Sequence, residues 1–491
     1  MSRRLVALAC AGALAASAAT GLGAPTAPPE PSREGAAASR EAFARGYARY
    51  EAGDYAGAAT LLHACLGGIT PDDPDYDWAL FFLGISLYRL GLSHAAVDTL
   101  SHLVTRRPNA KIVSYALEIL EEVTRTRPYD RDQVLLSVVC DQEYGFVDDD
   151  LGDFIHYYQG LFDWEHGYRE WGDRHFAAIR PGTRYHRRYL YQKALYRIRD
   201  GDLDGAGAIL EGLVRDDGTG PDLRDEVRVT LARLLYEQKR FDEADRVYRT
   251  IEKPNVEQAR YLMERAWSQY RLGNPQRAMG LLYAFQAPSF WRDFTPEYFI
   301  LKSFVYKDVC HYQAALAVVE EFRERYGRAL EFIYGRGGPL ESDELLQILL
   351  RRRSVAEPYR FLGLLEAERR AAARLADPGL AAWLERIYAL QVAETTRELR
   401  DRVREEYEAL AADLLRYEEQ AHLLEYEIGL DMYQRVSEYH YRQRRPASRD
   451  GDDRVVAFAF QGEFWNDELD DYRVILEDRC GSPERWDVFF K

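Results

Sequence analysis

The chain has 491 residues, and its 65 lysines and arginines against 81 aspartates and glutamates give a formal net charge of -16. This acidity disfavours nucleic-acid binding, because neutralising phosphates requires clustered Lys and Arg, and it disfavours direct docking on anionic lipid. The length suits two to four ordinary domains or one long solenoid, and the 47% apolar residues are ample for a core.

Residues 1–24 have the layout of a secretory signal peptide. Arg3 and Arg4 form a positive start, an apolar stretch covers about residues 5–16, and small residues follow. The apolar stretch is too short to span a bilayer as a stable anchor. Only five apolar residues precede Cys10, which is short for a lipoprotein signal, so lipidation of Cys10 stays an alternative.

Residues 25–40 are rich in Pro, Ala, Ser and Glu, and we expect them to form a flexible leader after cleavage. The mature chain is therefore expected in the periplasm or outside the cell, with association to the outer membrane as an alternative. No later stretch is long and apolar enough for a transmembrane span.

From residue 41 to residue 330 the chain repeats a helical-hairpin pattern, with most steps between about 34 and 38 residues. One residue of each copy is expected to end the first helix in the left-handed conformation. Aligned on that position, the copies give seven turn residues: Gly53, Gly91, Gly167, Gly201, Lys239, Gly273 and Cys310.

Small residues recur on both helices of each copy, where they would let the two helices approach closely. On the first helix they are Gly46, Gly84, Ala194, Ala232 and Ala266. On the second helix they are Ala58, Ala96, Ala206, Ala244, Ala278 and Ala315. Pro108 is expected to end its hairpin, because proline cannot continue a helix.

These residues resemble the tetratricopeptide repeat family, of the bacterial periplasmic or envelope adaptor type. The resemblance covers residues 41–330 with one gap, around 105–150, which contains a helical pattern in residues 112–124. It implies an all-α, right-handed α-solenoid that holds a peptide or a protein in its concave groove.

Residues 341–445 predict a helical or coiled-coil region with one helix of about 60 residues. Its seam alternates steps of three and four residues and consists of Tyr407, Leu410, Leu414, Tyr417, Ala421, Leu424 and Ile428. The seam suits self-association through 407–428, or packing along residues 357–375 or on the solenoid. We favour packing within the chain. Residues 446–491 form a short tail rich in acidic and aromatic residues.

No catalytic motif is present: the sequence lacks HExxH, GxSxG and a Walker loop. We therefore expect no catalytic residues, no cofactor and no metal site. His156, His166 and His175 lie in one weak repeat, but their steps of nine and ten residues do not place them on one helix face at ligand spacing.

Four cysteines follow the signal peptide: Cys65, Cys140, Cys310 and Cys480. In an oxidising compartment they allow three pairings. Because Cys65 and Cys310 fall inside helical repeat positions, we expect both to be buried free thiols.

Two sets of residues near the end of each first helix are candidates for partner binding in the groove. The aromatic set is Tyr50, Tyr88, Trp164, Tyr236 and Tyr270, and the basic set is Arg89, Arg199 and Arg271. Packing between repeats is the alternative role for the aromatic residues. For the arginines the alternative is a ladder of salt bridges, because acidic residues occupy the intervening repeats.

The sequence therefore predicts a non-enzymatic protein–protein interaction scaffold or adaptor in the bacterial periplasm or cell envelope, with a protein or peptide partner and no nucleic acid. An outer-membrane assembly accessory factor is the alternative within the binding class. A cell-wall enzyme with a repeat domain is the alternative from another class.

Overall fold

The computed structural model describes residues 33–106, 110–127, 138–140, 144, 149–251, 258–287, 290, 293–442 and 474–480. The signal peptide, Cys10, Pro108 and the predicted tail outside 474–480 lie beyond these residues. None of the described helices combines the length and the apolar character needed to cross a membrane. The chain divides into two compact units, Met1–Leu90 and Gly91–Lys491, which we describe one at a time.

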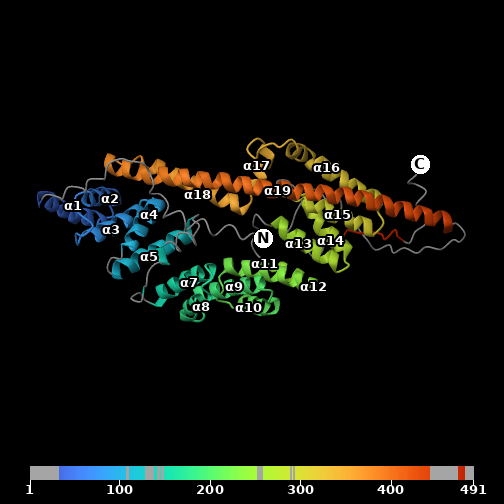
Figure 1. The fold of residues 1–491 in the computed structure, drawn as a ribbon, viewed down its shortest axis with the longest axis horizontal. Coiled ribbons are helices and arrows are strands. Elements are labelled where there is room, and N and C mark those ends of the chain that lie inside the picture. Colours follow the sequence, from blue (N-terminus) through green and yellow to red (C-terminus); the bar gives the residue numbers. More distant parts are fainter. Residues whose placement is uncertain are drawn as a thin grey trace. The chain divides into compact units, whose positions relative to one another are not determined.

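The first unit contains α1 (Arg33–Glu51), α2 (Tyr55–Leu66) and α3 (Tyr76–Arg89) (Figure 1). Helices α1 and α2 form a hairpin, and α2 also packs on α3. Gly46 is buried in α1, where an added Cβ would lie 2.9 Å from Leu62. The hairpin therefore depends on the absence of a side chain at its crossing point.

The second unit continues the series of hairpins. Its helices are α4 (Ser93–Thr105), α5 (Ala110–Thr126), α7 (Asp149–Glu165), α8 (Arg169–Ala178), α9 (Arg184–Arg199), α10 (Leu203–Arg215), α11 (Pro221–Glu237), α12 (Phe241–Tyr248), α13 (Gln258–Arg271), α14 (Pro275–Tyr283), α15 (Pro296–Asp308), α16 (Tyr312–Tyr334), α17 (Asp343–Leu349), α18 (Arg353–Ala372) and α19 (Pro378–Arg442), with a short 3₁₀ turn at Ala284–Gln286. No strand occurs among the residues that the model describes. The predicted fold class, an all-α array of helical hairpins followed by a long helix, is confirmed.

All seven predicted turn residues have a positive φ. The values are 79° at Gly53, 78° at Gly91, 86° at Gly167, 86° at Gly201, 62° at Lys239, 75° at Gly273 and 58° at Cys310. At Gly201, the backbone N–H donates to the carbonyl of Ile198 over 3.1 Å, and the N–H of Asp202 donates to the carbonyl of Arg197 over 2.9 Å. This pair of hydrogen bonds is a Schellman motif, which ends the first helix and satisfies carbonyls that would otherwise lack donors.

A small residue follows each turn residue after five positions. Six of these are the predicted alanines, and each of them has an exposed fraction of 0%. The seventh is Gly172, which the sequence pattern had not singled out. A Cβ on Gly172 would lie 2.5 Å from the Trp164 ring and 2.9 Å from the backbone oxygen of Gly160. The α7–α8 crossing therefore has no room for the methyl group that the other six crossings carry.

The predicted long helix is α19, which is 65 residues long, and α18 lies alongside it (Figure 1). The seam of α19 is buried within the chain. The exposed fractions of Leu410, Leu414 and Ile428 are all 0%. Leu410 and Leu414 join an apolar cluster with residues of α15, α16 and α17, including Phe322 and Leu349. In this structure the seam therefore packs against other helices of the same chain, which is the favoured alternative.

A buried carboxylate joins α4 to both α18 and α19. One oxygen of Glu368 accepts the backbone N–H of His94 and the hydroxyl of Tyr388, each over 2.9 Å. The His94 and Tyr388 rings lie 5.7 Å apart, centre to centre. Burial raises the pKa of Glu368 and lowers the pKa of His94 to about 4. Burial therefore disfavours the charged form of each of these two side chains.

One expectation about the cysteines was wrong. Cys65 is a buried free thiol, as expected, and burial raises its pKa to about 11. Cys310 is instead bonded to Cys480 in a disulfide that joins residues 170 positions apart. Cys310 occupies a turn rather than the interior of a helix, so its sulfur is accessible to the returning C-terminal segment.

The close crossing at Gly172 gives a first prediction. Gly172→Ala places a methyl group against a backbone oxygen, so we expect the free energy of unfolding to fall by about 1–3 kcal/mol. Gly212→Ala is the matched control, since Gly212 is an exposed position of α10 where an added Cβ meets nothing within 4 Å. The control should raise stability by up to about 1 kcal/mol through helix propensity. Urea denaturation measures the free energy of unfolding of both variants. If the two substitutions change it equally, α7 and α8 do not cross closely at Gly172.

The neutral state of His94 gives a second prediction, on pH. Its folded pKa lies below the unfolded value of 6.5, so its contribution to stability is complete above pH 6.5 and is lost as the pH falls towards 4. Relative to His94→Gln, which does not titrate, the wild-type chain should lose about 2 kcal/mol of unfolding free energy between pH 7.5 and pH 5.

The raised pKa of Glu368 has the opposite effect, because it lowers the free energy of unfolding as the pH rises. The wild type and the His94→Gln variant both contain Glu368, so this effect cancels when the two are compared. Denaturation curves at the two pH values supply the four free energies. Parallel loss in wild type and variant would show that His94 is not held neutral.

Candidate functional site

The five aromatic candidates lie in the last turn of their helices and are all half-buried. Trp164 shows how they pack: its ring centre lies 4.6 Å from that of Phe176 and 4.5 Å from that of Tyr196, and its Nε1 donates to Asp173. Three of the others also contact rings, measured between ring centres: Tyr50 with Phe82 at 5.2 Å, Tyr236 with Phe241 at 5.0 Å and Tyr270 with Trp267 at 5.7 Å. Tyr88 lies in the last turn of α3.

Tyr270 also forms a polar contact between repeats. Its hydroxyl donates to Asp308 at the end of α15 over 2.6 Å. Burial, together with this hydrogen bond, raises the pKa of Tyr270. Tyr270 therefore links the end of α13 to the end of α15 while its side chain remains half-buried.

The three arginine candidates are exposed, and each is the last residue of its helix. The guanidinium of Arg199 lies 4.2 Å from the centre of the Tyr196 ring, and that of Arg271 lies 5.5 Å from the centre of the Trp267 ring. A cation at this end of a helix is also favoured by the helix dipole. These two arginines are therefore held by aromatic rings of their own helices and keep their charge at the surface.

Further contacts between the first helices of successive hairpins lie one or more turns before the helix ends. Tyr191 of α9 is hydrogen-bonded to Thr230 of α11 over 2.9 Å. Arg233 of α11 pairs with Glu264 of α13 at 3.0 Å, and Trp267 of α13 donates to Glu297 of α15 over 2.8 Å. These residues connect α9, α11, α13 and α15 side by side. The sequence pattern placed its charge ladder at the helix ends and missed this set.

Glu264 is the most highly connected member of this set. Besides Arg233, it accepts the hydroxyl of Tyr248 over 2.6 Å and pairs with Arg260 at 3.2 Å. Burial is the main cause of the raised pKa of Tyr248, and the Glu264 charge adds to it. The contact between α11 and α13 is thus set by specific partners and is not a loosely solvated charge pair.

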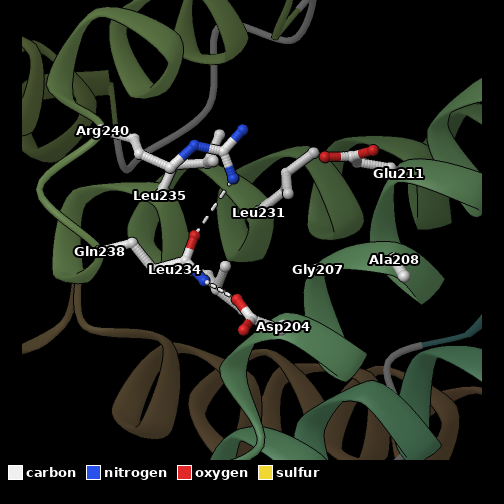
Figure 2. Close-up of a pocket in the computed structure, with 9 residues that line it drawn as sticks. All are labelled: Asp204, Gly207, Ala208, Glu211, Leu231, Leu234, Leu235, Gln238 and Arg240. Carbon is white, nitrogen blue, oxygen red and sulfur yellow. Dashed lines mark hydrogen bonds between the residues drawn. The ribbon is translucent and has the colours of Figure 1, made fainter.

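A small pocket opens between α10 and α11, on the second helix of one hairpin and the first helix of the next (Figure 2). Gly207 and Ala208 face Leu231, Leu234 and Leu235 across it. At its rim, Gln238 donates to Asp204 over 3.1 Å and Arg240 donates to Gln238 over 3.3 Å. Its volume of about 190 Å³ is below the range of about 300–1,000 Å³ usual for small-molecule sites.

Two of the three histidines meet although they do not share a helix face. The Nδ1 atoms of His156 and His175 lie 3.1 Å apart, because α7 and α8 form a hairpin that brings together positions distant along the sequence. Nε2 of His175 lies 3.7 Å from Asp163, and burial lowers the pKa of both histidines. His166 is separate from them, and its Nδ1 lies 2.8 Å from the carbonyl of Phe162. Across the described residues, no three or more His, Cys, Asp or Glu side chains are grouped to hold a metal ion.

Residues 197–268, from the end of α9 into α13, match the family model of the tetratricopeptide repeat. No curated protein sequence matches the chain. This stretch contains the left-handed turn at Lys239 and the contacts from Arg233 to Glu264 described above.

The solved structures that are similar to the chain include three repeat proteins. A tetratricopeptide repeat protein from Parabacteroides merdae is 15% identical, with 59% of this chain and 93% of that chain covered and a TM-score of 0.24. The TPR domain of P58(IPK) is 13% identical, with 79% and 98% covered and a TM-score of 0.20. A circular tandem repeat protein is also 13% identical, with 81% and 90% covered and a TM-score of 0.13.

Proposed function

We propose that this chain, whose residues 197–268 are tetratricopeptide repeats, is a non-enzymatic scaffold that binds a protein or peptide partner across the first helices of its hairpins. Tetratricopeptide repeats are protein–protein interaction scaffolds. The observation that carries the proposal is the set of side-chain contacts that joins α9, α11, α13 and α15. These contacts make the first helices one continuous surface, as a partner longer than a single hairpin requires.

The arginine candidates are better placed to meet a partner than the aromatic ones. Arg199 and Arg271 are exposed and already oriented by rings, so binding them would require little further ordering of their side chains. Tyr236 and Tyr270 instead contact Phe241 and Asp308. Replacing these tyrosines would alter the fold as well as the surface.

We further propose the bacterial periplasm or cell envelope as the place of action. The signal-peptide pattern of residues 1–24 supports an exported protein. The Cys310–Cys480 disulfide supports an oxidising compartment, since such bonds persist there and are rare in the cytosol. An adaptor in an envelope assembly fits both observations.

The proposal predicts a difference between two matched double variants. Arg199→Glu with Arg271→Glu reverses charge on the first helices, whereas Arg215→Glu with Arg246→Glu makes the same change on α10 and α12. The side chains of Arg215 and Arg246 are 74% and 65% exposed. In a crosslinking pull-down from the envelope fraction, the first pair should reduce partner capture at least tenfold and the second should leave it unchanged.

Circular dichroism serves as the control for folding, because all four positions are exposed and their substitution should leave helicity intact. Equal capture by both double variants, at full helicity, would place the partner elsewhere on the molecule and contradict the proposed surface.

A further inference from the structure

Residues 474–480, which we call the C-terminal strap, form no helix or strand and lie against α14 and the turn between α15 and α16. The N–H of Val474 donates to the carbonyl of Gln276 in α14 over 3.2 Å, and the N–H of Arg479 donates to the carbonyl of Val309, just after α15, over 3.1 Å. Between them, the carbonyl of Glu477 accepts Nε2 of His311 over 2.7 Å. The strap is therefore recognised largely through its backbone.

One side chain of the strap is buried. Leu476 is 8% exposed and belongs to the apolar cluster of α13, α14 and α15, whereas its neighbour Ile475 is 61% exposed. This alternation is that of an extended peptide with one side towards the protein. The surface beneath the strap thus takes up Leu476, with the partly buried Val474 packed on the same cluster, and otherwise contacts main-chain groups of the strap.

The strap ends in covalent and polar contacts to two elements. Cys480 forms the disulfide with Cys310, at the left-handed turn between α15 and α16, and its carbonyl accepts Nη1 of Arg435 in α19 over 2.9 Å. Each residue of the strap loses backbone freedom when it is held in place. The disulfide closes a long loop and therefore opposes release of the strap.

We propose that the surface formed by α14, the α15–α16 turn and the end of α19 is a binding site for an extended apolar peptide. The chain fills this site with its own strap while Cys310 and Cys480 are bonded. Reduction of the disulfide opens the site to another peptide of the same chemistry. This use of main-chain hydrogen bonds with one side-chain recess is how extended peptides are commonly bound.

The opening step is a thiol–disulfide exchange with a dithiol reductant. One thiolate of the reductant attacks Sγ of Cys480, which forms a mixed disulfide and releases the Cys310 thiolate to take up a proton. The second thiol of the reductant then displaces the Cys480 thiolate, which is also protonated. Two electrons and two protons reach the cysteines, and the reductant leaves as its own disulfide.

The test uses the full mature chain and a fluorescent peptide with the sequence of residues 474–479. Fluorescence anisotropy is measured for the oxidised chain, the chain in dithiothreitol, and the Cys480→Ser variant. We expect the reduced chain and the variant to bind the peptide at least tenfold more tightly than the oxidised chain. A peptide carrying the Leu476→Asp change should not bind to any of them.

Two controls keep the result specific to the strap. Dithiothreitol should not change peptide binding by the Cys480→Ser variant, which has no disulfide at this position. Hydrogen exchange should show the amides of Val474 and Arg479 protected in the oxidised chain and exposed after reduction, with α13–α15 unchanged. Equal peptide binding before and after reduction, no binding in either state, or unchanged protection of the strap would overturn the proposal.

Discussion

A residue in the left-handed conformation, followed five positions later by a small residue, is the constraint on which the seven described repeat hairpins depend. The turn residue ends the first helix and reverses the chain, and the small residue lets the second helix cross it closely. Gly201 with Ala206 and Cys310 with Ala315 show the same spacing. Once each hairpin is closed, its first helix presents one side to the next, and polar pairs such as Arg233 with Glu264 can form.

The features that repeat along the sequence could be predicted from it. Alignment on the glycines identified Lys239 and Cys310 as turn residues although neither is glycine, and both have a positive φ. The steps of three and four residues after Tyr407 identified the buried side of α19. In both cases the repeated pattern arises from a local structural feature, either the end of a helix or the apolar side of a helix.

Contacts between distant positions could not be predicted, because no period specifies them. The Cys310–Cys480 bond depends on how the C-terminal segment returns to the last hairpin, and four cysteines permit three pairings. The meeting of His156 with His175 depends on the crossing of α7 and α8. The polar contacts from α9 to α15 depend on the rotation of each helix about its axis. For the candidate site, the positions of the helix ends could thus be predicted from the sequence, but the side-chain pairs that join α9, α11, α13 and α15 could not.

The most direct test of the central constraint is at Lys239, which is exposed and has a φ of 62°, so that backbone conformation can be separated from packing. The left-handed conformation costs a residue with a Cβ about 1–2 kcal/mol, and glycine does not pay this penalty. The measurement is the free energy of unfolding of Lys239→Gly and Lys239→Val by urea denaturation. We predict that the glycine variant is at least as stable as the wild type and that the valine variant is less stable by more than about 1 kcal/mol, because a β-branched side chain is strained at this φ. If the valine variant is as stable as the glycine variant, position 239 is not a left-handed turn and the proposed register of the hairpins is wrong.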